Sequence, residues 1–361
     1  MYSTQNLQSF ELENGSTIEP LEIGYHTYGT INKECDNVIW VCHALTANSD
    51  VLDWWSGLFG KGRLFDPKKY FIVCPNALGS CYGTTGPLSK IGGNSPLLDQ
   101  FPHFTTRDMA RAHEALRKKL NIDNIKLLIG ASLGGQQAIE WAIESSSAIQ
   151  RLVLIATNAQ HAPYGIAFNE SQRLAIYADP TFGNGNQEGG KNGLAIARSI
   201  ALLSYRSYEG YGQTQKDSDN SLVDDFKAAS YQRYQGQKLV KRFNAYSYVA
   251  LSKAMDSHNV ARGRESIENA LEQVDAETLV IGISTDQLFP VAEQQLLADY
   301  IPKAHYHEIR SQYGHDGFLI ETGAITSILE DFVDNKLNNH KPTVFKTTIR
   351  KSELININNL N

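Results

Sequence analysis

Long apolar runs are absent from the sequence. No segment approaches the roughly 20 consecutive apolar residues that a membrane-spanning helix needs. The N-terminus also lacks the basic stretch followed by an apolar stretch that marks a secretory signal. These two absences predict a soluble, cytoplasmic protein.

Positive charge is in short supply. The chain has 33 lysines and arginines against 39 aspartates and glutamates, which gives a formal net charge of −6 at pH 7. The basic residues do not gather into a patch of the kind that binds a phosphate backbone. We therefore expect no nucleic-acid partner.

Cysteine is rare as well. The four cysteines, Cys35, Cys42, Cys74 and Cys81, all fall in the first quarter of the chain. None has the C-x-x-C spacing, so reduced thiols in or beside core strands are favoured over a disulfide framework or a metal site. His305 and His307 alternate along an expected strand, but two histidines without further ligands nearby indicate structural roles rather than zinc binding. We expect neither a metal nor a bound cofactor.

What the sequence does contain is a series of continuous apolar runs. Hydrophobic residues make up 42% of the 361 residues, enough for one large core and an insertion. The clearest runs cover residues 38–42, 70–74, 125–129 and 152–155. Runs without polar alternation are typical of strands covered on both faces, as in a parallel sheet with flanking helices. An amphipathic pattern over residues 107–120 predicts a crossover helix.

The organisation changes in the middle of the chain, where the pattern becomes helical and rich in Tyr, Gln and Ser. We predict an α/β core built from residues 1–160 and 276–336, a helical lid inserted over 161–275, and a loosely attached tail over 337–361. The insertion has more apolar and aromatic residues than a lid over one small pocket would hide, so we expect a homodimer through the lid helices. These residues are Ile200, Leu202, Leu203, Tyr205, Tyr231, Tyr234, Phe243, Tyr246 and Tyr248.

Ser132 lies in a G-x-S-x-G motif. The motif spans residues 130–134, follows an apolar run and precedes a helical pattern over 136–142. Between a strand and a helix, this motif forms a sharp turn that exposes the serine hydroxyl above a parallel sheet. An ordinary glycine-rich turn is the alternative, and the downstream residues argue against it. We interpret Ser132 as a nucleophile.

Two later residues complete the order nucleophile, acid, histidine that α/β-hydrolases follow. Asp286 comes just after the apolar run 278–283, where this architecture places its acid. His315 lies in a glycine-flanked loop before the last expected helix. We predict that His315 takes the Ser132 proton and that Asp286 holds the imidazole in the required tautomer.

Such a triad also needs an oxyanion hole. In this architecture one donor is the N–H after the nucleophile and the other comes from an earlier strand-to-helix loop. The sequence nominates the backbone N–H groups of Leu133 and Leu45. His43, in the same early loop, is interpreted as structural. The glycine-rich loop 79–87 lacks the G-K-[ST] ending of a P-loop, so it does not indicate a nucleotide triphosphate site.

Five segments together resemble the homoserine O-acetyltransferase family. They are residues 43–46, the glycine-rich loop 78–87, the serine motif, Arg242-Phe243-Asn244 with Ser247-Tyr248, and residues 313–319. The resemblance extends from about residue 15 to 335. It implies an α/β-hydrolase fold with a lid that pairs two subunits. It also implies acetyl transfer from acetyl-CoA, as co-substrate, to the γ-hydroxyl of L-homoserine in methionine biosynthesis.

The same resemblance assigns residues to roles. The family's triad positions fall on Ser132, Asp286 and His315. Arg198 and Asp316 match a substrate-binding arginine and aspartate, and Tyr205 matches a tyrosine of the active-site tunnel. Opposite charges at Arg198 and Asp316 suit the carboxylate and ammonium of an amino acid. The alternative for each is an ordinary ion pair within the structure.

Other functions stay open. An esterase or thioesterase would keep the triad but would not need Arg198 and Asp316. A non-catalytic receptor or scaffold is disfavoured because all three triad residues are present. Among acyltransferases, succinyl-CoA as donor or serine as acceptor are alternatives, although residues 286–290 resemble the acetyl-using branch.

Overall fold

The central element is an eight-stranded sheet. The computed structural model describes residues 1–91, 93 and 95–334. The strand order is β1-β4-β6-β5-β7-β8-β9-β10, and all pairs from β6 to β10 are parallel, whereas β1 with β4 and β4 with β6 are antiparallel. The strands are β1 (Tyr2–Leu7), β4 (Leu21–Tyr28), β5 (Val38–Cys42), β6 (Phe71–Pro75), β7 (Leu127–Ala131), β8 (Arg151–Ile155), β9 (Glu277–Ile283) and β10 (Ala304–Ile309). The predicted mostly parallel α/β fold is confirmed.

The observed strands follow the apolar runs to within two residues. The run at 38–42 coincides with β5. The run at 125–129 overlaps β7, which begins two residues later because Ile125 makes only an isolated bridge to Ile149. A separate two-stranded hairpin, β2 (Phe10–Glu11) with β3 (Thr17–Ile18), lies outside the main sheet.

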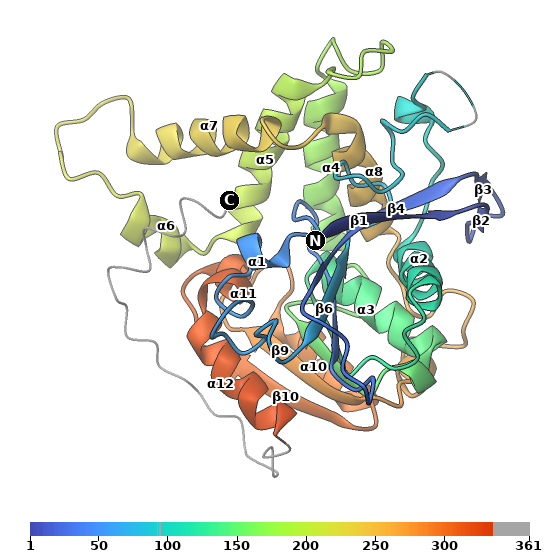
Figure 1. Cartoon of the computed structure of the whole chain (residues 1–361). Coiled ribbons are helices and arrows are strands. Elements are labelled where there is room, and N and C mark those ends of the chain that lie inside the picture. The colour runs from blue at the N-terminus through green and yellow to red at the C-terminus, as the bar shows by residue number, and fades with distance from the viewer. Residues whose placement is uncertain (92, 94, 335–361) are drawn as a thin grey trace.

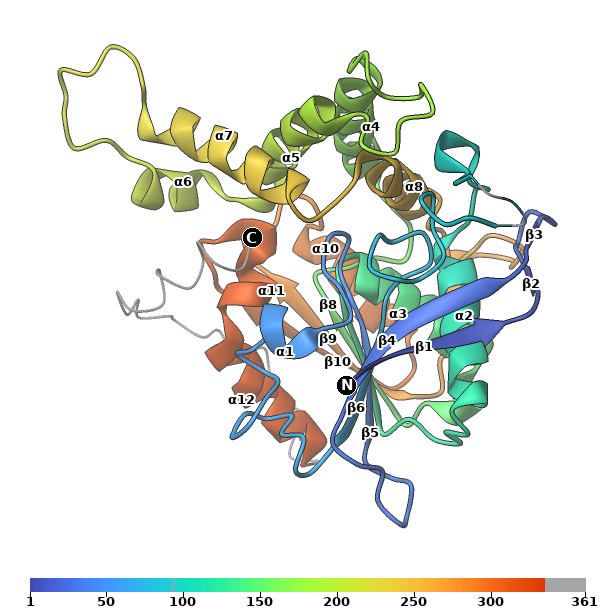
Figure 2. The same cartoon turned by 45° about the horizontal axis from the view of Figure 1, so that its top comes forward.

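Helices cover both faces of the sheet over its inner strands, which explains why β5 to β9 are mainly apolar, whereas the edge strand β1 is polar. Alternate residues of β5 divide between two buried clusters: Trp40 packs on one face and Ile39 and Val41 pack on the other. Figure 2 shows the two helical layers on either side of the sheet. One layer contains α2 (Thr106–Lys119), α3 (Leu133–Glu144) and α10 (Val291–Tyr300), and the other contains α1 (Val51–Trp54), α11 (Gly317–Ile320) and α12 (Thr322–Val333).

The crossover helix predicted over 107–120 is α2, shifted by one residue. Its start is set by Thr105, which accepts a hydrogen bond from the Asp108 N–H while the Asp108 carboxylate accepts one from the Thr105 N–H. This reciprocal capping satisfies N–H groups that have no partner inside the helix.

A group of helices is inserted between β8 and β9 and lies above the sheet in Figure 1. These helices are α4 (Pro163–Tyr177), α5 (Lys191–Tyr205), α6 (Tyr208–Thr214), α7 (Lys227–Val240) and α8 (Ala245–Asp256). They fall within the range expected for the lid, and we call them the lid helices. The same range also contains α9 (Ile267–Leu271), which packs against α10 of the core.

The tail predicted over 337–361 lies outside the described residues. Over the part of the chain that is described, every helix is too short or too polar to cross a membrane.

Candidate active site

Ser132 occupies a strained turn between β7 and α3. Its backbone has φ 56° and ψ −128°, a conformation that residues other than glycine rarely adopt. The glycines of the motif are required by close backbone contacts. A Cβ on Gly130 would lie 2.2 Å from the Gly134 carbonyl oxygen, and one on Gly134 would lie 2.1 Å from the Cys42 carbonyl oxygen. The motif therefore brings the start of α3 against the end of β5 and turns the serine out of the sheet.

The structure brings the three predicted triad residues into one hydrogen-bonded chain. Nε2 of His315 lies 2.9 Å from Oγ of Ser132, and Nδ1 lies 2.6 Å from Oδ2 of Asp286. The other carboxylate oxygen of Asp286 accepts hydrogen bonds from the N–H groups of Leu288 and Phe289, each at 2.9 Å. These bonds fix the carboxylate, so Nδ1 of His315 carries a proton and Nε2 can accept one from the serine hydroxyl.

Aromatic rings enclose the imidazole of His315. Phe289 stacks on it with ring centroids 5.1 Å apart, Phe318 packs edge-on at 5.4 Å, and Tyr205 of the lid lies at 5.7 Å. Ser132, Asp286 and His315 are all at most 5% exposed. The rings hold the imidazole in place and keep bulk water from its faces.

The two nominated oxyanion donors lie on either side of the close contact between α3 and β5. Leu133 is the first residue of α3, and Leu45 lies in the loop after β5 and lines the cavity above Ser132. Neither N–H donates to an acceptor within the described residues. Two unpaired donors beside the nucleophile, one at a helix N-terminus, can bind an oxyanion.

His43 has the structural role expected of it. Its Nε2 accepts a hydrogen bond from the Ala77 N–H at 2.9 Å, so Nδ1 carries the proton and donates to the Ala44 carbonyl at 2.8 Å. Burial lowers the pKa of His43 to about 4. We call the loop after β5 that carries Leu45 the oxyanion loop. The neutral His43, hydrogen-bonded through both ring nitrogens, connects this loop to the segment after β6.

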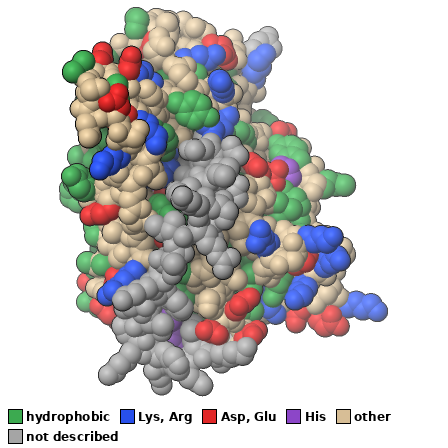
Figure 3. Space-filling model, turned by 90° about the vertical axis from the view of Figure 1, so that its left-hand side faces the viewer, with side chains coloured by type: hydrophobic (Ala, Val, Ile, Leu, Met, Phe, Trp, Pro, Cys, Tyr) green, Lys and Arg blue, Asp and Glu red, His purple; other side chains and the backbone are tan. Residues whose placement is uncertain are grey.

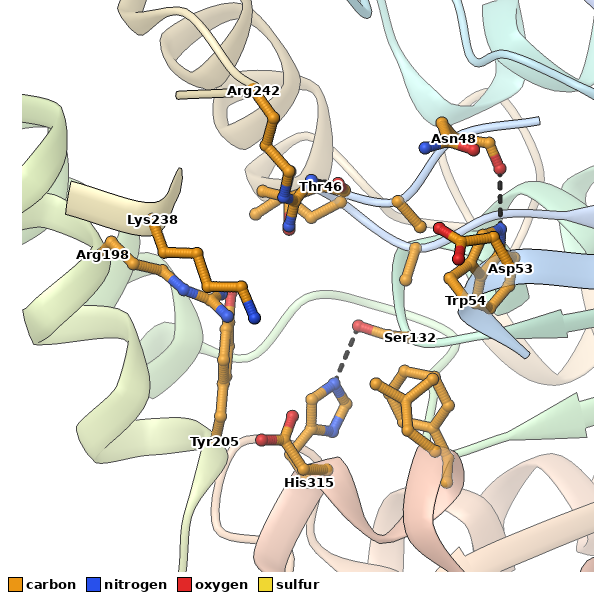
Figure 4. A pocket seen from close by; sticks show the side chains of 16 residues that line it. Thr46, Asn48, Asp53, Trp54, Ser132, Arg198, Tyr205, Lys238, Arg242 and His315 are labelled. Atoms are coloured by element: carbon orange, nitrogen blue, oxygen red, sulfur yellow. Dashed lines mark hydrogen bonds between the residues drawn. The ribbon is translucent and has the colours of Figure 1, made fainter. Parts of the chain in front are cut away.

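A cavity of about 170 Å³ opens above Ser132, between the core and the lid helices. Figure 4 shows Arg198 and Lys238 reaching into it from the lid, with Tyr205 beneath Arg198. The Arg198 guanidinium lies 5.5 Å from the centre of the Tyr205 ring, and only 3% of the residue is exposed. Asp316 also lines this cavity. All of the predicted substrate-binding residues thus lie at one site with the triad.

The structure adds an ion pair that the sequence did not reveal. Nε of Arg206 lies 2.6 Å from Oδ2 of Asp316, and both side chains are less than 10% exposed. Arg198 and Asp316, the two opposite charges predicted to bind the substrate, therefore line the same cavity. The ion pair of Asp316, however, is formed with Arg206. Arg206 directly follows Tyr205, but nothing else in the sequence marks Arg206 as a residue of the site.

Two further cations line the cavity and were also missed as site residues. Lys238 comes from α7, and burial together with nearby Arg242 and Arg198 lowers its pKa. Arg242 donates to the Tyr82 hydroxyl at 3.0 Å and to the Thr46 carbonyl. Arg242 belonged to one of the segments that carried the family resemblance, so a signal existed for it. Together with Arg198, these two residues make the lid side of the cavity electropositive.

In the described part of the chain, no three His, Cys, Asp or Glu side chains are grouped as metal ligands would be.

Comparison with known proteins identifies the family to which the chain belongs. The family model of the α/β-hydrolase fold matches residues 37–322. The homoserine O-acetyltransferase of Cyclobacterium marinum is 46% identical over 326 residues, which cover 90% of this chain and 93% of that protein. The enzyme of the same name from Trichormus variabilis is 41% identical over 327 residues, covering 90% and 91%. The chain belongs to the homoserine O-acetyltransferase family.

Solved structures agree with this assignment. The crystal structure of homoserine O-acetyltransferase from Bacillus anthracis has a TM-score of 0.84 at 27% identity and covers 96% of this chain and 99% of its own. The crystal structure of esterase E22 has a TM-score of 0.83 at 22% identity, covering 92% and 99%. The esterase shares the fold alone, so the backbone does not separate members of the homoserine O-acetyltransferase family from hydrolases.

Proposed function

We propose that this chain is a homoserine O-acetyltransferase that moves an acetyl group from acetyl-CoA to the hydroxyl of L-homoserine through an acyl-enzyme on Ser132. The observation that carries the proposal is the joint placement of a hydrogen-bonded Ser132–His315–Asp286 chain and the charged residues Arg198 and Asp316 in one cavity. Names and identities of the relatives support the same reaction.

In the first half-reaction the Ser132 oxygen attacks the thioester carbon while Nε2 of His315 takes its proton. The N–H groups of Leu45 and Leu133 stabilise the negative charge on the thioester oxygen. The carbon–sulfur bond then breaks, and the sulfur of CoA leaves with the proton from His315. Asp286 stabilises the imidazolium throughout without taking a proton. The product is an acetyl ester on Ser132.

In the second half-reaction the hydroxyl of homoserine takes the place of the thiol. His315 removes the hydroxyl proton as the oxygen attacks the ester carbon, and the proton returns to Ser132 as its bond to the acetyl group breaks. Water is a competing acceptor. A buried triad and aromatic rings around His315 favour transfer over hydrolysis because they limit access of water.

The acceptor is recognised by charge. Arg198 presents a planar guanidinium to the carboxylate of the amino acid, and Tyr205 supports that guanidinium from below. Asp316 accepts a hydrogen bond from the ammonium group. A plain esterase needs neither residue, which is the specific reason to prefer a transferase.

The test crosses acetyl-CoA and succinyl-CoA with homoserine and serine and identifies each product by mass spectrometry. The proposal requires O-acetylhomoserine as the main product. O-Succinylhomoserine or an O-acylserine would revise the donor or the acceptor. Loss of acetyl-CoA at a rate that homoserine leaves unchanged would favour an esterase or thioesterase, the activity class of the fold neighbour E22.

We also propose a cytoplasmic homodimer that pairs through the lid helices, working with free acetyl-CoA and without a resident cofactor. The support is the exposed apolar surface of these helices, although it differs from the set expected from sequence. Leu202, Phe243, Tyr246 and Tyr248 are buried within the subunit. Leu203 and Tyr234, both in the expected set, are exposed, and Tyr164, Leu174, Tyr177 and Ile196 of α4 and α5 are exposed as well. On the face drawn in Figure 3, hydrophobic side chains lie among acidic and basic ones.

A further inference from the structure

We propose that Arg206 is a positioning residue for the acceptor: it holds the Asp316 carboxylate in the cavity and so sets the affinity for the amino acid. This inference rests on the proposed function, and it assigns a role to a residue that does not line the cavity in the described structure.

The first support is the placement of the pair. Asp316 lines the cavity, while Arg206 lies behind it and touches it through a 2.6 Å contact between Nε and Oδ2. The angle of this contact falls short of a well-directed hydrogen bond, so the attraction is mainly one of charge. Arg206 is 9% exposed and Asp316 is 4% exposed, so water screens the pair little.

The second support is that Arg206 does not divide its charge between several carboxylates. Asp316 is the only carboxylate within ion-pair distance of Arg206 in the described structure. Tyr211 and Tyr231, whose rings pack edge-to-face with centroids 6.2 Å apart, also interact with Arg206. Because Arg206 engages Oδ2, the other oxygen of Asp316 is left to accept from an ammonium group. Without Arg206 the buried carboxylate would lose the cation with which it is paired, and it would turn or recruit water.

The third support is that the loop bearing His315 is held independently of this pair. The Ser207 hydroxyl donates to the Gln312 carbonyl, and the side chains of Gln213 and Gln312 bond at 2.5 Å. From the core, the Thr285 hydroxyl accepts from the Gly314 N–H at 3.0 Å. These bonds anchor the loop on both sides. Changing Arg206 should therefore disturb Asp316 while His315 keeps its position.

The experiment separates the two half-reactions. Arg206→Gln, Arg206→Lys and the control Arg233→Gln, an exposed arginine of α7, are compared with the unchanged protein. Acylation is followed as mass gain on Ser132 with acetyl-CoA alone, and transfer as the KM for homoserine. We expect Arg206→Gln to raise that KM about ten-fold or more while the acylation rate changes less than about three-fold. Arg206→Lys keeps the charge and should recover part of the affinity.

A double-mutant cycle tests whether Arg206 acts through Asp316. In an Asp316→Asn background, adding Arg206→Gln should change the KM for homoserine by less than about two-fold, because its target is already lost. This double variant also removes both buried charges, and thermal unfolding shows which variants fold. An equal loss of acylation and transfer in Arg206→Gln, or an undiminished effect in the Asp316→Asn background, would overturn the inference. If the unchanged protein itself transfers no acetyl group to homoserine, the proposed function fails instead.

Discussion

Arg242, which follows α7 of the lid, donates hydrogen bonds to the main-chain carbonyl of Thr46 and to the hydroxyl of Tyr82. Thr46 is the residue next to Leu45, whose N–H is one of the two proposed oxyanion donors. The lid therefore holds the oxyanion loop directly, and the glycine-rich loop 79–87 is tied to the same guanidinium. In the proposed mechanism, this contact therefore connects the acceptor site at the lid with the oxyanion donors beside Ser132.

Arg242→Met is expected to lower the acylation rate about 10- to 100-fold, because a loosened Leu45 N–H is a poorer oxyanion donor. Both half-reactions should suffer alike, since both pass through an oxyanion. Lys241→Met removes a neighbouring exposed cation and serves as the control. The measurement is pre-steady-state acylation by acetyl-CoA. An effect on the KM for homoserine alone would contradict a role in the oxyanion loop.

Ser132→Ala should abolish both transfer and the acetylation of the protein by acetyl-CoA. In the proposed mechanism this hydroxyl carries the acetyl group, and it lies 2.9 Å from Nε2 of His315, which takes its proton. Intact-mass spectrometry after incubation with acetyl-CoA gives the result directly. His315→Ala should be comparably damaging and Asp286→Asn somewhat less so, because triad residues act as a unit. A stoichiometric acetyl adduct on the Ser132→Ala protein would remove Ser132 as the nucleophile.

Arg198→Ala and Asp316→Ala should each reduce kcat/KM for homoserine by about 2–4 kcal/mol of transition-state stabilisation, the scale for losing a charged hydrogen-bonded partner. Arg198→Lys should also be harmful, because an ammonium cannot bind a carboxylate through two parallel hydrogen bonds. Acylation of Ser132 does not use the amino acid and should continue. Unchanged homoserine kinetics in both alanine variants would mean that the acceptor is bound elsewhere.

The parts of the site that follow local rules could be predicted from the sequence. The nucleophile Ser132 could be identified because its turn requires glycine at 130 and 134, where an added Cβ would lie only 2.2 and 2.1 Å from a main-chain oxygen. Asp286 and His315 could then be identified because this fold places the acid and the histidine in loops that follow particular strands. The inner strands could also be predicted from their apolar runs, because both of their faces are buried.

The contacts between the lid and the loops could not be predicted in this way. Arg198 and Tyr205 are seven residues apart on α5, so they share a face of that helix, and both line the cavity. Arg206 comes after the helix ends, and its direction depends on how that end packs against the His315 loop. Arg242 likewise depends on the position of α7 above the oxyanion loop. Burial of Tyr246 and Tyr248 was missed for the same reason, because sequence does not show which lid residues pack on the core.

Buried histidines should make the protein less stable as the pH falls. Burial lowers the pKa of His113 to about 4, whereas an unfolded histidine has a pKa near 6.5. His113 is neutral because Nδ1 accepts from the Trp40 indole N–H at 3.4 Å and Nε2 donates to the Gln137 amide oxygen at 2.9 Å. Between these pKa values the unfolded chain binds a proton that the folded protein does not. The free energy of unfolding therefore falls by up to about 1.4 kcal/mol per pH unit for this residue.

Denaturant unfolding of His113→Gln at pH 7 and pH 5 checks this prediction. Glutamine can keep one donor and one acceptor but does not titrate in this range. The number of protons taken up on unfolding should therefore fall by up to one, and the free energy of unfolding should depend less on pH. His103→Gln, at an exposed histidine, is the matched control and should leave the pH dependence nearly as it was. An equal pH dependence in His113→Gln and the unchanged protein would show that His113 is protonated to the same extent in both states.

The last prediction concerns assembly through the lid helices. Ile196 and Leu203 are seven residues apart on α5, so they lie on one face, and they are 53% and 55% exposed. Isolated exposed apolar residues are ordinary, but two on one face of α5, with Leu174 also exposed on the adjoining α4, fit the proposed interface with a second copy. We expect light scattering to give twice the subunit mass of 40.1 kDa at micromolar concentration.

Ile196→Asp combined with Leu203→Asp should convert this particle to the monomer, because two carboxylates would be buried without partners at the interface. Val223→Asp is the control, since Val223 is 91% exposed in the segment between α6 and α7. It should leave the mass unchanged. A 40.1 kDa particle for the unchanged protein would contradict the dimer, and a dimer that survives the paired aspartates would place the interface on another face.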